Sequence, residues 1–306
     1  MKICIVYGGT SREREISLKS GMSILKALST QKNVHAYDFD GDYEKLCTIV
    51  KNVDIVFNSL HGGEGENGTI QLFFENNNIK FTGSGSIASK KAMNKHIAKK
   101  LCDKHNIQTP NWIYLDKRLD LERLDIFNNK SIVIKPSNEG SSIRLSIIKD
   151  FNLKNIKKIN ELNLAVEKCY QVSDALLIEE YIDGRELTVS ILGGKVLPIL
   201  EIKPKNIFYD YECKYTKGRS EYIVPAKISN NIELKLKEYA FKIFNILGCR
   251  HYGRVDFRLS TDNKIYFLEL NTLPGFTNIS LFPKSAMEEN ITYENLLLNI
   301  IDLATK

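Results

Sequence analysis

The feature that most constrains the fold is the alternation of buried strands and amphipathic helices at the start of the chain. KICIVYGG (2–9) is an apolar, β-branched run that ends in a glycine pair, and VDIVFNSLHGG (53–63) repeats the pattern. Apolar residues at helical spacing follow each run, at 15–29 and 68–79. Because such alternation is typical of parallel sheets covered by helices, about the first 85 residues are predicted to form a doubly wound α/β unit.

After Thr109-Pro110 antiparallel hairpins are expected instead. SIVIKPSNEGSSIRLSII (131–148) has a polar loop between two strand-like runs, and LTVSILGGKVLPILEI (187–202) turns at a glycine pair. Further helices are expected at 87–105, at about 153–170 and at 230–248. The last has asparagines as caps at its start and Gly248 at its end. The sequence therefore predicts an α/β unit followed by an α+β part.

Charge and cysteine spacing exclude several classes of function. The 306 residues carry a formal net charge of +6, and the lysines are dispersed rather than gathered in a stripe, which argues against nucleic-acid binding. No apolar run approaches the roughly 18 residues of a membrane helix, and no secretory signal is recognisable, so no membrane association or export is expected. Six single cysteines, typical of reduced cytosolic thiols, are Cys4, Cys47, Cys102, Cys169, Cys213 and Cys249.

Three oxygen-bearing side chains stand in a predicted hairpin, residues 252–276. Asp256 lies in the first strand, and Glu269 and Asn271 lie two apart in the second, so all three can share one face. Two carboxylates and an amide suit Mg²⁺, which takes few protein ligands besides substrate phosphates. The alternative is that Asp256 simply pairs with an arginine of its own strand.

KPSNEGSS (135–142) is a candidate phosphate-binding loop. It joins Lys135 to a Gly-Ser segment whose backbone amides can cradle an anion. Lys95, on the helix expected at 87–105, is a second candidate phosphate ligand. Neither a P-loop nor a dinucleotide fingerprint is present, which leaves a hairpin loop that closes over a nucleotide. Taken alone, the loop is an ordinary hairpin turn and Lys95 a surface lysine.

With these motifs, the sequence closely resembles the D-alanine–D-alanine ligases of the ATP-grasp superfamily. The matching blocks, in the family's order, are GGTSREREISLKSG (8–21), HGGEGENGTIQ (61–71), FTGSGSIASKKAMNK (81–95), VIKPSNEGSS (133–142), LIEEYIDGRELTVSILG (177–193), FYDYECKYTKG (208–218), GRVDF (253–257) and ELNTLPGFTNISL (269–281). The resemblance implies a three-lobed ATP-grasp fold. An N-terminal doubly wound parallel-sheet lobe is expected at 1–86, and nucleotide-binding lobes with antiparallel sheets at 87–176 and 177–306.

The resemblance also implies an activity: two D-alanine molecules are joined at the expense of ATP, through an acylphosphate, for peptidoglycan synthesis. ATP and two Mg²⁺ ions, with Mn²⁺ as a substitute, are the expected cofactors. A cytoplasmic homodimer is expected. The alternatives are a ligase that forms D-alanyl-D-serine or D-alanyl-D-lactate, and a non-catalytic nucleotide-binding protein of the same fold.

Residue roles follow from the resemblance as well. Magnesium is expected at Asp256, Glu269 and Asn271. The residues expected to contact ATP are Lys95, Lys135 and Lys214 at the phosphates, Glu179, Glu180 and Tyr181 at the adenine, and Glu186 at the ribose. The residues expected at the reaction are Arg254 and the N–H of Gly275 as an oxyanion hole, Glu13 and His61 at the first D-alanine, and Ser280 and Leu281 at the second.

Glu13, Ser141 and Tyr215 are expected to form a hydrogen-bonded set that closes a lid, the loop YDYECKYTKG at 209–218, over the reaction. Such a lid would keep water from the acylphosphate. Each role has a simpler alternative. Glu13 would be a helix-capping carboxylate, His61 a structural histidine, and the lid a plain surface loop.

Four positions depart from the usual family pattern. Asn67 and Asn94 stand where aspartate is common, and we expect them to alter only packing or local hydrogen bonds. Leu72 replaces a glycine and is expected to fill a gap in helix packing, whereas Arg144 replaces a glycine beyond the phosphate loop and is expected to face solvent. Because none of the four removes a predicted metal ligand, a phosphate lysine or Arg254, activity is expected to survive.

Overall fold

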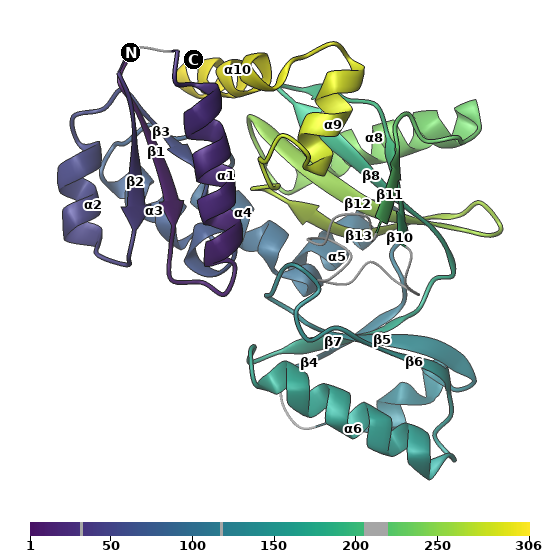
Figure 1. The fold of residues 1–306 in the computed structure, drawn as a ribbon. Helices are drawn as coiled ribbons and strands as arrows, with labels where there is room; N and C mark the ends of the chain where they lie inside the picture. The colour runs from purple at the N-terminus through teal and green to yellow at the C-terminus, as the bar shows by residue number, and fades with distance from the viewer. Residues whose placement is uncertain (31–32, 117–118, 205–219) are drawn as a thin grey trace.

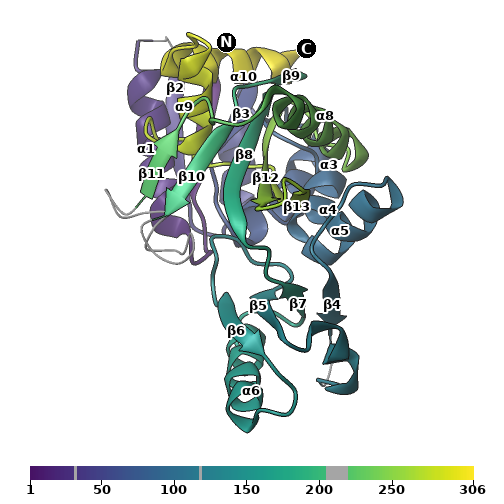
Figure 2. The ribbon, with the colours of Figure 1, turned by 90° about the vertical axis from the view of Figure 1, so that its right-hand side faces the viewer.

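The structure, a computed structural model, describes residues 1–30, 33–116, 119–204 and 220–306. These residues form three sheets with helices packed against them (Figure 1). In the view turned by 90°, one sheet and its helix extend away from the other two (Figure 2). Among the described residues, no helix is both long and apolar enough to cross a membrane.

The N-terminal sheet is parallel, in the order β2-β1-β3. Its elements are β1 (Ile3–Gly8), α1 (Arg14–Ala27), β2 (Val34–Phe39), α2 (Tyr43–Val50), β3 (Ile55–Asn58) and α3 (Thr69–Asn76), with a 3-10 turn at Gly63–Gly65. Because neighbouring residues of a strand face opposite ways, Ile5 packs with Ile24 of α1. Val6 packs on the other face with Leu46 and Phe74. The predicted doubly wound unit is confirmed.

The second sheet is antiparallel, in the order β4-β7-β5-β6. The elements of this region are α4 (Ser86–Met93), α5 (Lys95–Lys104), β4 (Trp112–Leu115), β5 (Lys130–Pro136), β6 (Ser146–Phe151), α6 (Ile156–Tyr170) and β7 (Leu176–Glu180), with a 3-10 helix at Glu122–Phe127. Helix α6 covers one face, where Leu162 and Cys169 pack with Ile132 and Ile134. Strands β5 and β6 are the hairpin predicted at 131–148, which is confirmed.

The third sheet has the order β11-β10-β8-β12-β13, with β9 paired to β8. The elements are β8 (Gly184–Leu192), β9 (Lys195–Val196), β10 (Leu200–Pro204), β11 (Ser220–Ile223), α8 (Asn230–Ile246), β12 (Tyr252–Ser260), β13 (Ile265–Asn271), α9 (Leu281–Glu288) and α10 (Tyr293–Thr305). Helix α8 packs Leu236 and Ile243 against Val255 and Phe257. The predicted antiparallel part is therefore confirmed as well.

Helix α10 returns to the N-terminal sheet. Its residues Leu297, Ile300 and Ile301 share one buried cluster with Ile5 and Phe57 of β1 and β3. The two chain ends accordingly lie close together (Figure 1). The C-terminal segment thus completes the core of the N-terminal sheet.

Three local predictions are wrong. The helix expected at 87–105 is broken at Asn94, whose extended backbone separates α4 from α5 and whose side chain accepts the N–H of Ile97 at 3.0 Å. Helix α8 follows Ser229 instead of an asparagine cap, although Gly248 does follow its end with a φ of 77°. Leu72 fills no gap, because it lies on the outer side of α3 and is 50 % exposed.

The cap at Asn94 gives a prediction for stability. Asn94→Ala removes the acceptor for one of the free N–H groups at the start of α5, so it should lower the free energy of unfolding by about 1 kcal/mol. Asn94→Asp keeps the acceptor and should unfold at the wild-type urea concentration. Urea denaturation followed by circular dichroism checks both variants, and equal stability of Asn94→Ala and wild type would contradict the assignment.

Candidate functional site

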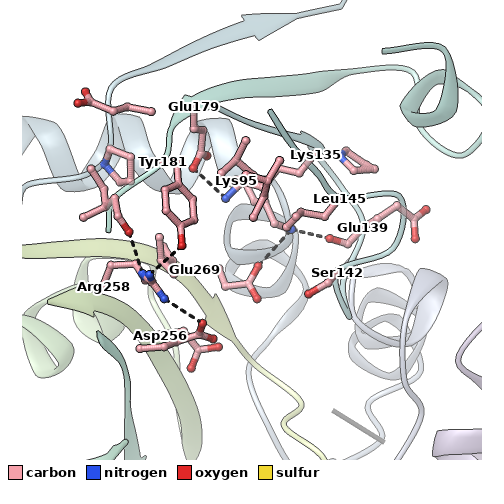
Figure 3. Close-up of a pocket in the computed structure, with 18 of the residues that line it drawn as sticks. Lys95, Lys135, Glu139, Ser142, Leu145, Glu179, Tyr181, Asp256, Arg258 and Glu269 are labelled. Carbon is pink, nitrogen blue, oxygen red and sulfur yellow. Dashed lines mark hydrogen bonds and ion pairs between the residues drawn. The ribbon is translucent and has the colours of Figure 1, made fainter. Parts of the chain in front are cut away.

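Two adjoining pockets lie where the sheets meet, and both include Gly140. The predicted site residues that line the first pocket are Lys95, Lys135, Glu179, Glu180, Tyr181, Glu186, Asp256 and Glu269. Those that line the second pocket are Glu13, His61, Ser141, Arg254, Asn271, Gly275, Ser280 and Leu281. Lys214 and Tyr215, with the whole of the predicted lid, lie outside the described residues. Segments far apart in sequence therefore meet at one place, which Figure 3 shows for the first pocket.

The acidic hairpin has the expected geometry. In the register of β12 and β13, Asp256 lies opposite Glu269, and Arg254 lies opposite Asn271, next to a bulge. Asp256 is buried, and Thr188 of β8 donates its hydroxyl to Oδ1 of Asp256 at 2.5 Å. The three predicted oxygen donors therefore gather at the end of the hairpin where the two pockets meet.

The alternative pairing predicted for Asp256 is also present. Arg254 donates from Nε at 2.9 Å and from Nη2 at 2.8 Å to the two carboxylate oxygens, a bidentate arrangement. The amide of Asn271 donates to Oδ2 at 3.0 Å. Among the described residues, no group of three or more histidine, cysteine or acidic side chains is suited to hold a metal. Two carboxylates and one amide do fit a hard cation that takes its other ligands from water or phosphate.

Lys95 connects the acidic hairpin to the predicted phosphate loop. Its Nζ donates to the backbone carbonyl of Glu139 at 2.5 Å and lies 3.3 Å from Oε2 of Glu269 (Figure 3). Burial raises the pKa of the Glu139 carboxyl group. In the same loop Ser141 and Ser142 have φ angles of 52° and 57°, which non-glycine residues adopt only when their surroundings hold them there.

The far side of the first pocket is built around Arg258 of β12. The guanidinium group donates to the carbonyl of Ile182 at 3.1 Å, and its Nη1 lies 3.5 Å from the carboxylate of Glu186. It also lies 5.6 Å from the centre of the Tyr181 ring, as a cation–π contact (Figure 3). Arg258 thereby links the third sheet to the segment that follows β7.

The second pocket joins the N-terminal sheet to the phosphate loop. The hydroxyl of Ser141 donates to Oε1 of Glu13. Glu13 precedes α1, yet its side chain makes no cap hydrogen bond, so the helix-capping alternative is not realised. A Cβ atom at Gly140 would lie 3.3 Å from Oε2 of Glu13, so a larger residue there would require the carboxylate to shift.

His61 is buried and lines the second pocket. Its Nε2 lies 3.1 Å from the hydroxyl of Ser20, and its Nδ1 lies 3.4 Å from the carboxylate of Glu66. Ser280, which lines the same pocket, precedes α9, and its Oγ accepts the N–H of Thr277 at 3.1 Å. The imidazole and the serine hydroxyl thus both have fixed positions at the cavity.

Several residues that hold the site were not predicted: Thr188, Arg258, Ser20 and Glu66. Thr188 lies opposite Asp256 in the register of β8 and β12, so only the pairing of these strands could have identified it.

Two of the departures from the family pattern lie near the site. Asn67 accepts the N–H of Thr69 at 3.0 Å. Arg144 is exposed, as expected.

A family described as "D-ala D-ala ligase C-terminus" matches residues 101–302, and "D-ala D-ala ligase N-terminus" matches residues 44–84. The chain is 40% identical over 314 residues to a D-alanine–D-alanine ligase of Carboxydothermus hydrogenoformans, covering 99% of this chain and 98% of that protein. It is 38% identical over 302 residues to that of Aquifex aeolicus, covering 98% and 100%.

Among solved structures, the D-alanine–D-alanine ligase from Bacillus anthracis complexed with ATP is similar. It superposes with a TM-score of 0.85 at 30% identity, over 99% of this chain and 97% of that one. The similarity therefore spans all three sheets and both pockets.

The hydrogen bond between Thr188 and Asp256 gives a prediction that needs no ligand. Thr188→Val keeps the shape but leaves a buried carboxylate with one donor fewer, so the free energy of unfolding should fall by about 2 kcal/mol. Thr188→Ser keeps the hydroxyl and should lose less. Chemical denaturation measures both, and a Thr188→Val protein as stable as wild type would show that this hydrogen bond contributes nothing.

Proposed function

The chain belongs to the D-alanine–D-alanine ligase family, and on that basis we propose which of its side chains carry the ATP-dependent joining of two D-alanine molecules. The observation that supports the assignment most is the junction of the two pockets. Gly140 borders both, and Arg254, which lines the second pocket, is hydrogen-bonded to Asp256, which lines the first. A phosphoryl donor in one pocket would therefore lie beside a carboxylate acceptor in the other. The alternative activities are not favoured.

ATP is proposed to bind in the first pocket. Lys95 and Lys135 would offset phosphate charge, and Lys214 of the lid would reach the terminal phosphate. The adenine would lie along Glu179, Glu180 and Tyr181, with Glu186 at the ribose. The burial of both pocket lysines supports this, because a positive charge held in a poorly solvated site binds an anion more strongly than one in water.

Two Mg²⁺ ions, with Mn²⁺ as a substitute, are proposed at Asp256, Glu269 and Asn271. When bound, the ions would neutralise charge on the transferred phosphoryl group. The protein's own part is to hold the oxygen donors in place. The hydroxyl of Thr188 donates a hydrogen bond to Asp256, and the ammonium group of Lys95, which also contacts the phosphate loop, pairs with Glu269.

The first D-alanine is proposed to bind near Glu13 and His61. Its carboxylate would accept the phosphoryl group, and the amine of the second D-alanine, held at Ser280 and Leu281, would attack the acylphosphate. As the amine nitrogen bonds to the carbonyl carbon and loses its proton, negative charge develops on the carbonyl oxygen, until the bond to phosphate breaks and phosphate leaves. Arg254 and the N–H of Gly275 line the cavity as the donors for that charge, and preorganised donors of this kind lower the barrier most.

The remaining proposals concern closure and context. Glu13, Ser141 and Tyr215 would join in one hydrogen-bonded set that closes the lid; the contact between Ser141 and Glu13 supports the first half of it. The lobe boundaries at 86 and 176, a cytoplasmic location and a homodimer are proposed from the family resemblance. The described cysteines are free, and this state is typical of a reducing compartment.

Product analysis tests the proposed activity. With equal D-alanine, D-serine and D-lactate, ATP and Mg²⁺, mass spectrometry should find mainly D-alanyl-D-alanine across the pH range of activity. A hydroxy acid has a neutral nucleophile, whereas the ammonium group of D-alanine must lose a proton, so competition from D-lactate would be strongest at low pH. If the depsipeptide D-alanyl-D-lactate were the main product at neutral pH, the proposal would be wrong.

The site residues have their own test. Glu269→Gln and Arg254→Ala should each lower kcat by about a hundredfold, because each removes a charge expected to act in the transition state. Asp262→Asn, in the exposed turn of the same hairpin, is the matched control and should keep kcat. D-alanine-dependent phosphate release provides the rate, and circular dichroism shows whether the variants are folded. Near-wild-type turnover in both would mean that the site is misplaced.

A further inference from the structure

A third lysine lies behind the first pocket. Lys99 is one helical turn beyond Lys95 on α5, so both side chains leave the same face of the helix. Lys99 is 0% exposed, and lysine is among the residues that are almost never fully buried unless they are paired. It does not line the pocket, and neither the motifs nor the proposed reaction uses it.

The partner of Lys99 is Glu179, the buried carboxylate at the end of β7. Its Oε1 lies 3.3 Å from Nζ of Lys99, and its Oε2 lies 3.0 Å from Nζ of Lys135. One carboxylate is thus shared by two ammonium groups, Lys135 at the pocket and Lys99 behind it. The ring of Trp112 completes the surroundings of Lys99, with its centroid 5.4 Å from Nζ.

The two contacts of Glu179 leave one unit of positive charge in this cluster. Burial raises the pKa of Glu179, but Lys135 and Lys99 outweigh it and the net pKa is lowered, so the carboxylate is ionised at neutral pH. Burial lowers the pKa of Lys99 to about 8, with Glu179 opposing the shift, so Lys99 is still mostly protonated at pH 7. Two ammonium groups therefore face a single carboxylate.

Packing alone does not account for Lys99. Its Nζ and Oε1 of Glu179 have no aligned hydrogen bond among the described residues, so apart from the ring of Trp112 their contact is a bare ion pair. A buried ion pair is often no more stable than apolar residues of the same volume, because both charges lose their hydration. What Lys99 does change is the charge at the pocket: without it, Glu179 would be compensated by Lys135 alone.

We propose that Lys99 is a positioning residue for the nucleotide, which balances the charge of Glu179 and so leaves the charge of Lys135 available to the phosphates of ATP. This inference rests on the proposed function, in which Lys135 contacts phosphate. Because Lys99 pairs with Glu179, which is itself proposed at the adenine, the inference implies a larger effect of Lys99 on the phosphate part of the ligand than on the nucleoside.

The test measures the Kd of two ligands by calorimetry: an ATP analogue with an NH bridge between the β- and γ-phosphates, with Mg²⁺, and adenosine by competition. Lys99→Met should weaken the analogue by about tenfold and adenosine by less than about twofold. Lys100→Met changes the exposed neighbouring lysine of the same helix and should leave both constants unchanged. An equal loss for adenosine would show that Lys99 only supports the fold, and an unchanged Kd for the analogue would also overturn the inference.

Two further variants keep the result unambiguous. Lys99→Gln also removes the charge and carries the same test if Lys99→Met does not fold. In a Glu179→Gln background, where no carboxylate remains to balance, Lys99→Met should change the Kd of the analogue by less than about threefold; a full further loss would contradict the inference.

Lys135→Met separates this inference from the proposed function. It should weaken the analogue more than Lys99→Met does. If Lys135→Met binds the analogue as wild type does, the proposed nucleotide site itself fails, whereas a loss with Lys135→Met but none with Lys99→Met rejects only the role of Lys99.

Discussion

The structure depends on how two opposed carboxylates are accommodated. Asp256 and Glu269 face each other across β12 and β13, and like charges directly opposite in a sheet are destabilising. Each is compensated from a different part of the chain: Asp256 by Arg254 and by the hydroxyl of Thr188, and Glu269 by Lys95 from α5. The negative charge of the hairpin is therefore compensated within the third sheet and by helix α5. A pair of acids that would weaken an ordinary hairpin becomes a contact that holds α5 against the third sheet.

The contacts of Lys95 also explain why the two pockets adjoin. Lys95 contacts both Glu269 and the carbonyl of Glu139, so the phosphate loop is held against the acidic hairpin. The same loop reaches the N-terminal sheet through Ser141 and Glu13. One short segment thus contacts both α5 and the N-terminal lobe, and these contacts hold the left-handed backbone of Ser141 and Ser142.

Most of the fold could be predicted from the sequence, because strand and helix periods differ and the glycine pairs mark turns. The shared face of Asp256, Glu269 and Asn271 followed from spacing and a hairpin turn alone. What could not be predicted depends on strand order and on local competition for backbone groups. The role of Thr188 can be predicted only if the pairing of β8 with β12 is known. At Asn94 the backbone either continues the helix or takes an extended conformation in which the side chain caps α5, and the sequence pattern does not decide between the two. Leu72 was misplaced because an apolar residue in a helix does not itself say which face it lies on.

The return of α10 to the N-terminal sheet has a consequence for the order of folding. Residues near position 300 complete a core that begins with Ile5 and Phe57, and such distant contacts require a large loop to close first. During synthesis β1, α1 and β3 leave the ribosome early, yet the face of the sheet that α1 covers stays partly exposed until α10 has emerged. The core of the lobe made first is therefore completed last, and its partly exposed apolar face is a surface that a chaperone could bind on the growing chain.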